Sequence, residues 1–125
     1  MRDRPTILVV EDEVLIRMSA VDFLQDVGFD TLQANNAPAA RAIFASRPDI
    51  AAVFTDIEMA GAFDGLAFAR EVHDQRPDVF VLVTSGRQLP LSPAIPTNCV
   101  FLPKPYSPSA VALALWGLPR RAASH

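Results

Sequence analysis

Short apolar runs alternate with stretches of helical periodicity along the chain. Five of these runs are predicted strands. The most apolar of them, such as 6–10, show the pattern typical of strands covered on both faces, whereas 31–34 is a short, weak strand. The predicted strands are 6–10, 31–34, 50–55, 79–83 and 99–102. The predicted helices, where apolar residues recur at helical spacing, are 14–27, 37–46, 66–75 and 108–118. This alternation predicts an α/β fold, a doubly wound sheet of five parallel strands.

Boundary signals accompany the predicted helices. Asn36 and Ser107 can cap the second and last of them, and each is followed by a proline in the first turn, where proline is tolerated. Gly28 supplies a stop for the first helix. The apolar positions of that helix are Leu15, Met18, Val21, Phe23, Leu24 and Val27. The apolar positions of the last helix are Val111, Leu113, Leu115, Trp116 and Leu118.

One connection departs from the alternation. Residues 87–98 carry a proline at every third position from 90 to 96, and an interior proline costs a helix about 3 kcal/mol. We therefore expect the fourth helix, between the last two strands, to be short, irregular or missing. The rest of the chain predicts a single domain over 1–125, with a core at about 5–118, a loose tail at 119–125 and no output domain.

Composition narrows the function. The net charge of −3 gives no basic footprint for nucleic acid. No run of about 18 apolar residues could span a membrane. The single cysteine, Cys99, excludes an internal disulfide and fits a reducing compartment, where we expect a buried, inert thiol. These features predict a cytoplasmic protein.

Ionisable and hydroxyl residues stand where the predicted strands end. In an open parallel sheet, ligands bind at the carboxyl ends of the strands, near the point where strand order reverses. We therefore expect these side chains to converge at one edge. They are Glu11 and Asp12 after the first strand, Asp56 at the third, Thr84 and Ser85 at the fourth, and Lys104 after the fifth.

Three carboxylates in one cleft repel each other unless a cation offsets their charge. Mg²⁺ is the natural candidate, because it prefers oxygen ligands and uses few carboxylates alongside phosphate oxygens. Zinc is disfavoured, since no histidine or cysteine lies near these acids in the sequence. A carboxylate, a divalent cation, a lysine and a hydroxyl together suit phosphoryl transfer, in which an aspartate can be the nucleophile.

Four motifs in order resemble those of response-regulator receiver domains, the phosphorylatable half of two-component signalling. They are VVEDE at 9–13, FTDIEM at 54–59, VTSG at 83–86 and FLPKPY at 101–106. The resemblance covers about residues 5–118. It implies a flavodoxin-like sheet with strand order 2-1-3-4-5, and a stand-alone receiver.

The resemblance also implies a role for each site residue. Asp56 would accept a phosphoryl group, and Lys104 would pair with Asp56 and then with the phosphate. Glu11, Asp12, Asp56 and the backbone carbonyl of Glu58 would bind Mg²⁺, with Glu11 acting through water. Thr84 and Ser85 would contact the phosphoryl group, Phe101 would be the switch aromatic residue, and the bond before Pro105 would be cis.

Three departures from the common receiver pattern bear on these expectations. The loop after Asp56 is about one residue longer than usual and lacks the proline after Met59. Glu58 and Gly86 occupy positions that influence how long the phosphoryl group survives in this family. The proline-rich 87–98 stretch alters the face that many relatives use to dimerise, so we expect a monomer.

One expected partner is a histidine kinase or a histidine phosphotransfer protein of a bacterial phosphorelay, which would dock around the first helix and the loop before the last helix. The other expected partner is an unidentified protein target. Two other functions stay open. One is a Mg²⁺-dependent aspartyl-phosphate hydrolase resembling the haloacid dehalogenase group, although here the acid two residues after Asp56 is Glu58. The other is a receiver-like binding module that works without phosphorylation.

Overall fold

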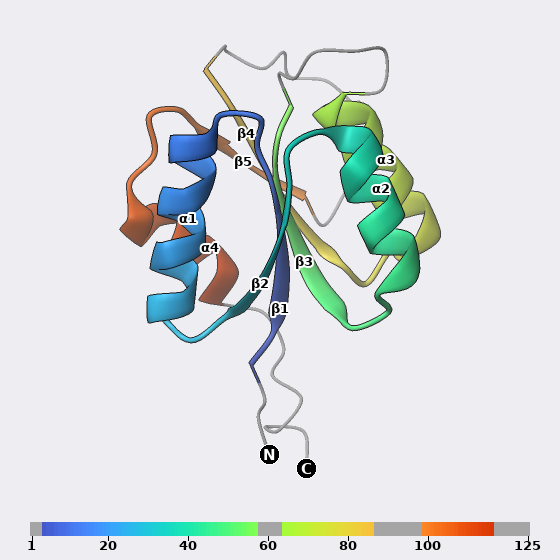
Figure 1. The fold of residues 1–125 in the computed structure, drawn as a ribbon, viewed down its shortest axis with the longest axis horizontal. Coiled ribbons are helices and arrows are strands. Elements are labelled where there is room, and N and C mark those ends of the chain that lie inside the picture. Colours follow the sequence, from blue (N-terminus) through green and yellow to red (C-terminus); the bar gives the residue numbers. More distant parts are fainter. Residues whose placement is uncertain (1–3, 58–63, 87–98, 117–125) are drawn as a thin grey trace.

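The computed structural model describes residues 4–57, 64–86 and 99–116, which form a five-stranded sheet flanked by four helices (Figure 1). The strands are β1 (Thr6–Val10), β2 (Asp30–Ala34), β3 (Ile50–Asp56), β4 (Phe80–Ser85) and β5 (Cys99–Pro103). The helices are α1 (Val14–Asp26), α2 (Ala37–Ser46), α3 (Gly65–Gln75) and α4 (Pro108–Trp116). The predictions made for 87–98 and for the tail lie outside the described residues.

All five strands are parallel and lie in the order β2-β1-β3-β4-β5, so the predicted doubly wound sheet is confirmed. β1 pairs with β2 on one side and with β3 on the other, and strand order therefore reverses beside β1. The carboxyl ends of the strands lie at the top of Figure 1. This is the edge at which a ligand site is expected.

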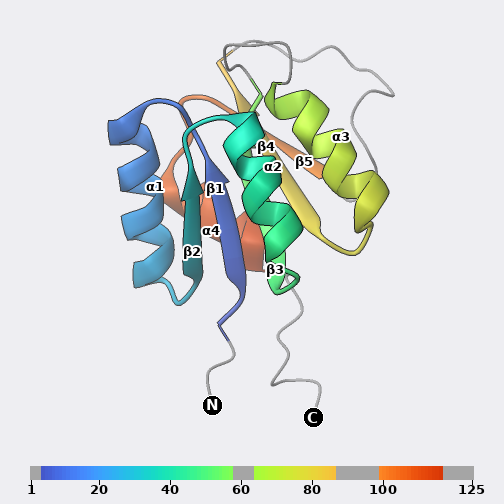
Figure 2. The same cartoon turned by 45° about the vertical axis from the view of Figure 1, so that its right-hand side comes forward.

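Helices cover both faces of the sheet (Figures 1 and 2). Alternate residues of β1 point to opposite faces, as the pleat of a strand requires. Leu8 and Val10 join the core beneath α2 and α3, whereas Ile7 and Val9 join the core beneath α1 and α4. This double burial explains why the strands read as continuous apolar runs rather than as an alternation.

Side-chain caps fix where three helices begin. Asn36 Oδ1 accepts the Ala39 N–H at 2.7 Å, and Ser107 Oγ accepts the Ala110 N–H at 3.1 Å, which confirms both predicted caps. The Asp64 carboxylate caps α3 in the same way, and this cap was not predicted. Each such cap typically stabilises a helix by about 1 kcal/mol.

Helical spacing identified only some of the buried apolar residues. In α1 the buried positions are Ala20, Val21 and Leu24, whereas Leu15 is 82% exposed and Met18 is 51% exposed. In α4, Leu113 is likewise 76% exposed. These side chains share the period of the core residues but lie on the outer surface of their helices.

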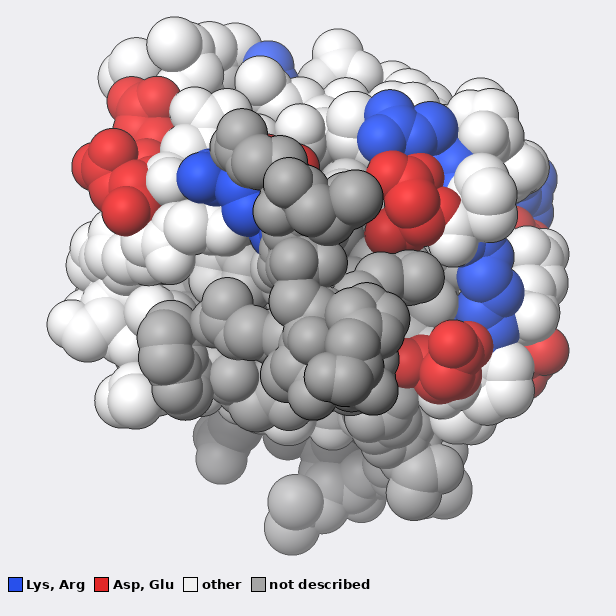
Figure 3. All heavy atoms as spheres, turned by 90° about the horizontal axis from the view of Figure 1, so that it is seen from below, with Lys and Arg blue, Asp and Glu red and all other residues white. Residues whose placement is uncertain are grey.

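The end of the molecule opposite the strand carboxyl ends carries charges of both signs, interspersed rather than gathered (Figure 3). Part of this view is covered by residues that the structure does not describe. No helix within the described ranges is long and apolar enough to cross a membrane.

Candidate functional site

Strand order brings three acids together at the carboxyl edge of the sheet. Because β1 pairs directly with β3, the residues after β1 lie beside Asp56 at the end of β3. One carboxylate oxygen from each of Glu11, Asp12 and Asp56 lies within 4.8 Å of the others. Glu11 and Asp56 are buried, whereas Asp12 is exposed. The predicted acidic cluster is therefore present, with one acid open to solvent.

Lys104 reaches this cluster from the loop after β5. Its Nζ donates to Asp56 Oδ2 at 2.8 Å and to Glu11 Oε1 at 3.3 Å. Its backbone N–H donates to the Ser85 carbonyl oxygen at 2.9 Å, which holds the loop against the end of β4. The Lys104–Pro105 peptide bond is cis, as the resemblance to receiver domains implied. One ammonium group thus bridges two buried carboxylates, one just after β1 and one at the end of β3.

Burial governs the protonation behaviour of this bridge. Burial raises the pKa of the Glu11 carboxyl and the nearby Asp56 charge adds to the rise, while hydrogen bonds from the Glu13 N–H and from Lys104 oppose it. Burial acts to lower the pKa of the Lys104 ammonium, but its bonds and charge pairing with Asp56 and Glu11 raise it overall. The site holds more carboxyl groups than ammonium groups, so a further cation would stabilise it.

The other predicted site residues lie on β4 and β5. Thr84 is 2% exposed, and its hydroxyl oxygen has no hydrogen-bond partner among the described residues. Ser85 is buried next to it. Phe101 is half-buried and packs against the core beneath α2 and α3. Glu58, the expected source of a backbone ligand, lies outside the described residues.

Sequence reasoning missed the contacts that hold the loop between β1 and α1. The Glu11 N–H donates to the Ala34 carbonyl at 3.1 Å, and the Glu11 carbonyl accepts from Arg17 Nη1 at 2.8 Å. The Glu13 N–H donates to Glu11 Oε2 at 3.2 Å. Every hydrogen-bonding group of Glu11 therefore has a partner. No local pattern in the sequence indicates the Arg17 contact.

Gly65, the first residue of α3, lies against the phosphoacceptor candidate. A Cβ atom at this position would overlap the backbone carbonyl oxygen of Asp56 and would lie 2.7 Å from Ile57 Cα. The Thr55 hydroxyl also donates to that carbonyl, at 3.0 Å. The first residue of α3 thus touches the peptide bond that joins Asp56 to Ile57, an approach only glycine allows.

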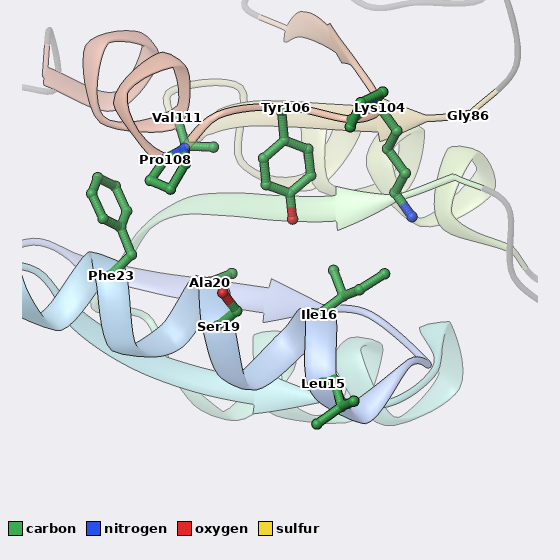
Figure 4. A pocket seen from close by; sticks show the side chains of 11 residues that line it. Leu15, Ile16, Ser19, Ala20, Phe23, Gly86, Lys104, Tyr106, Pro108 and Val111 are labelled. Atoms are coloured by element: carbon green, nitrogen blue, oxygen red, sulfur yellow. The ribbon is translucent and has the colours of Figure 1, made fainter.

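A cavity of about 670 Å³ opens beside Lys104, between α1 and the loop that leads into α4 (Figure 4). Most of its lining is apolar, including Ile16 and Phe23 from α1 and Val111 from α4. Tyr106 projects from the loop toward α1 and packs edge-on against Phe54, with ring centroids 5.4 Å apart. Burial raises the pKa of its phenol, and the charge of Glu11 adds to the effect. The cavity therefore adjoins the charged site.

A parallel sheet of this order, with paired acids and a lysine at its carboxyl edge, defines a class of signalling domain. The family model for the response regulator receiver domain matches residues 7–112. The chain belongs to this family, whose members are generally signalling modules rather than enzymes and generally have a kinase partner.

Individual relatives agree with this assignment. AruR, a transcriptional regulatory protein of Pseudomonas aeruginosa, is 30% identical over 124 residues, which cover 94% of this chain. The match spans 50% of AruR, so this chain corresponds to about half of that curated relative.

Solved structures show the same fold. A response regulator receiver protein from Sinorhizobium medicae superposes with a TM-score of 0.81 at 24% identity, covering 91% of this chain and 93% of that one. NtrX from Brucella abortus gives a TM-score of 0.79 at 33% identity, covering 90% of this chain and 26% of that one.

Proposed function

We propose that this chain is a phosphoacceptor switch in which Asp56 takes a phosphoryl group from a histidine kinase or a histidine phosphotransfer protein. One observation carries the proposal: the Lys104 ammonium lies 2.8 Å from Asp56 and 3.3 Å from Glu11, beside a buried Thr84 hydroxyl that has no partner within the described ranges. An acceptor carboxylate, a mobile cationic group and a free hydroxyl are what a phosphoaspartate requires.

The transfer is an in-line displacement. An Asp56 carboxylate oxygen attacks the phosphorus of a phosphohistidine, a P–O bond forms as the P–N bond breaks, and the leaving imidazole nitrogen keeps the electron pair and takes up a proton. The product acyl phosphate carries more negative charge and more acceptor oxygens than the carboxylate. Lys104 then bonds a phosphoryl oxygen, and the Thr84 hydroxyl donates to another.

Glu11, Asp12 and Asp56 fit Mg²⁺, because three clustered carboxylates offer hard oxygen donors and the exposed Asp12 leaves room for water. Asp12 and Asp56 would hold the ion directly and Glu11 through water, with the backbone carbonyl of Glu58 as a further ligand. When bound, the ion offsets the charge of the transferring phosphoryl group.

The change at Asp56 reaches the surface through neighbouring strands. Asp56 pairs in register with Thr84 on β4, and Phe101 lies across from Val83, one residue before Thr84. When Thr84 moves toward the phosphoryl group, the space beside Phe101 changes and the aromatic ring repositions. An unidentified protein target then binds the altered surface around β5.

The phosphodonor docks over α1 and the loop before α4. Leu15 and Met18 present exposed apolar surface there, and the cavity lined by Tyr106 opens next to Lys104 (Figure 4). Apolar surface rimmed by polar residues marks protein interaction sites. A donor seated here brings its phosphohistidine to the same edge of the sheet as Asp56.

The test is incubation with Mg²⁺ and acetyl phosphate, followed by intact mass measurement, with Asp56→Asn as the control variant. We expect one added phosphoryl group in the wild-type protein, and none in the variant or without Mg²⁺. Steady donor hydrolysis without an adduct would favour the aspartyl-phosphate hydrolase instead. If neither an adduct nor hydrolysis is seen, and purified histidine kinases as donors give the same result, a binding module that works without phosphate is favoured.

A further inference from the structure

We propose that Arg17 is a positioning residue that orients the Glu11–Asp12 backbone for cation binding, an inference that rests on the proposed function. Arg17 lies on the first turn of α1 and reaches back over the loop that carries both acids. Its Nη1 donates to the Glu11 carbonyl oxygen at 2.8 Å, and its Nε donates to Gln33 Oε1 on β2 at 3.1 Å. One guanidinium group therefore joins α1, the acidic loop and the edge strand.

The contact matters because it fixes the peptide bond between the two acids. The Glu11 carbonyl belongs to the same rigid peptide plane as the Asp12 nitrogen. The Glu11 N–H is already held by the Ala34 carbonyl, so Arg17 secures the remaining main-chain group of this residue. The direction in which Asp12 leaves the backbone is thereby set.

Asp12 depends on this backbone more than its neighbours do. Glu11 and Asp56 are buried and held by Lys104, whereas Asp12 is exposed and its carboxylate has no hydrogen-bond partner in the described part of the chain. Groups that orient metal ligands from behind affect metal affinity roughly 10–100-fold when they are removed. Arg17 acts on Asp12 in this way, through the main chain.

The charge of Arg17 allows its positioning role to be distinguished from a purely electrostatic effect on the cation. A guanidinium beside the site repels a divalent cation, so deleting it would tighten Mg²⁺ binding if its charge alone mattered. Deleting a positioning contact weakens binding instead. The two effects have opposite signs, and the observed direction distinguishes them.

Substitutions of graded chemistry sharpen the test. Arginine offers several N–H groups in a rigid fork, which lets it serve the Glu11 carbonyl and Gln33 together. Arg17→Lys keeps the charge but supplies one nitrogen for two acceptors. Arg17→Gln removes the charge and can still donate to the Glu11 carbonyl, so it should recover part of the affinity lost in Arg17→Ala.

The matched control is Arg41→Ala. Arg41 makes a two-pronged pair with Glu71, at 2.8 and 2.7 Å, between α2 and α3 on the other face of the sheet. The Arg41→Ala substitution removes an arginine and an ion pair but leaves the acidic loop unchanged. Gln33→Leu is a second probe, because it deletes the outer anchor of Arg17 and leaves position 17 intact.

The experiment is Mg²⁺ titration by calorimetry, together with amide hydrogen exchange on the metal-free proteins. We expect Arg17→Ala to raise the Mg²⁺ Kd roughly tenfold or more, and Arg41→Ala to leave it within about twofold of the wild-type value. In the metal-free protein, exchange of the Glu13 N–H, which bonds Glu11 Oε2, should accelerate in Arg17→Ala and stay unchanged in Arg41→Ala.

Unchanged or tighter binding in Arg17→Ala, with unchanged exchange, would overturn the role of Arg17. If Arg17→Ala does not fold, Gln33→Leu decides, since it should loosen binding in the same direction by a smaller factor. A wild-type protein that binds no Mg²⁺ would contradict the proposed function instead, and the exchange comparison would still report on Arg17.

Discussion

Replacing Lys104 by methionine tests how charge is balanced at the site. The substitution keeps an unbranched stem and deletes the ammonium that bonds Asp56 at 2.8 Å and Glu11 at 3.3 Å. Removing one partner of a buried ion pair costs about 3–5 kcal/mol, because the other charge stays buried and unpaired. The Lys104 side chain is 20% exposed, so solvent screening lowers the expected loss to about 2–3 kcal/mol. For a domain of this size we expect Tm to fall by roughly 6–15 °C.

The pH dependence of this loss identifies its cause. Without the ammonium, the raised pKa of Glu11 rises further, so the native variant binds protons more tightly than the unfolded chain does. Stability then falls as pH increases from the unfolded pKa through the raised native pKa. The difference from the wild-type protein should therefore be smallest in acid and largest near neutral pH, and Mg²⁺ should narrow it.

Thermal unfolding followed by circular dichroism, without Mg²⁺, measures this from about pH 5 to about pH 8. Arg41→Met is the control, because its partner Glu71 lies on the surface between α2 and α3 and its loss should move Tm little at any pH. A Lys104→Met variant as stable as the wild-type protein near neutral pH would refute the reasoning. So would a loss that does not shrink in acid.

Three further measurements follow from the structure. Gly65→Ala forces a Cβ into the Asp56 backbone, which displaces the acceptor, so phosphorylation by acetyl phosphate should slow at least roughly tenfold. Gly28→Ala is the control: Gly28 has φ 106 and open space around it, so this substitution should lower Tm and leave the phosphorylation rate unchanged. Mg²⁺ affinity should weaken as pH falls toward the raised pKa of Glu11, starting at a higher pH than an ordinary glutamate would give; a flat profile to about pH 5 would contradict this. Burial raises the pKa of Cys99 to about 11, so a thiol reagent at about pH 8 should react far more slowly with the native protein than with the unfolded chain.

The sheet and its acidic edge could be predicted because both follow from local patterns. Continuous apolar runs mark strands covered on both faces, and parallel strands must place their carboxyl ends together. Asp56 and Lys104 could thus be assigned to one site although they are far apart in sequence. Strand β2 was the weakest signal, since as an edge strand it carries polar residues such as Asp30 and Gln33.

The supporting contacts could not be predicted, because they depend on tertiary placement. The Arg17–Glu11 bond needs α1 to start at one particular angle to β1, and no residue spacing encodes that angle. Gly65 looked like any turn glycine until α3 was placed on the Asp56–Ile57 peptide. In both cases the interaction involves backbone atoms of the partner residue, which leave no trace in the identity of that residue.

The two faces of the sheet also differ in a way that periodicity cannot reveal. Beneath α2 and α3, Phe44 packs edge-on against Phe68 in the core, with ring centroids 6.0 Å apart. On the α1 side an open cavity of about 670 Å³ remains beside Lys104, and Leu15 is 82% exposed at its margin. Large apolar side chains at this margin would stabilise the domain if they pointed inward and filled the cavity. Their outward placement, next to the candidate phosphoacceptor, is consistent with the proposed phosphodonor surface. The helical period is the same for a helix that faces only its own core and for one that also faces a partner, so the apolar pattern of α1 alone does not distinguish these two roles.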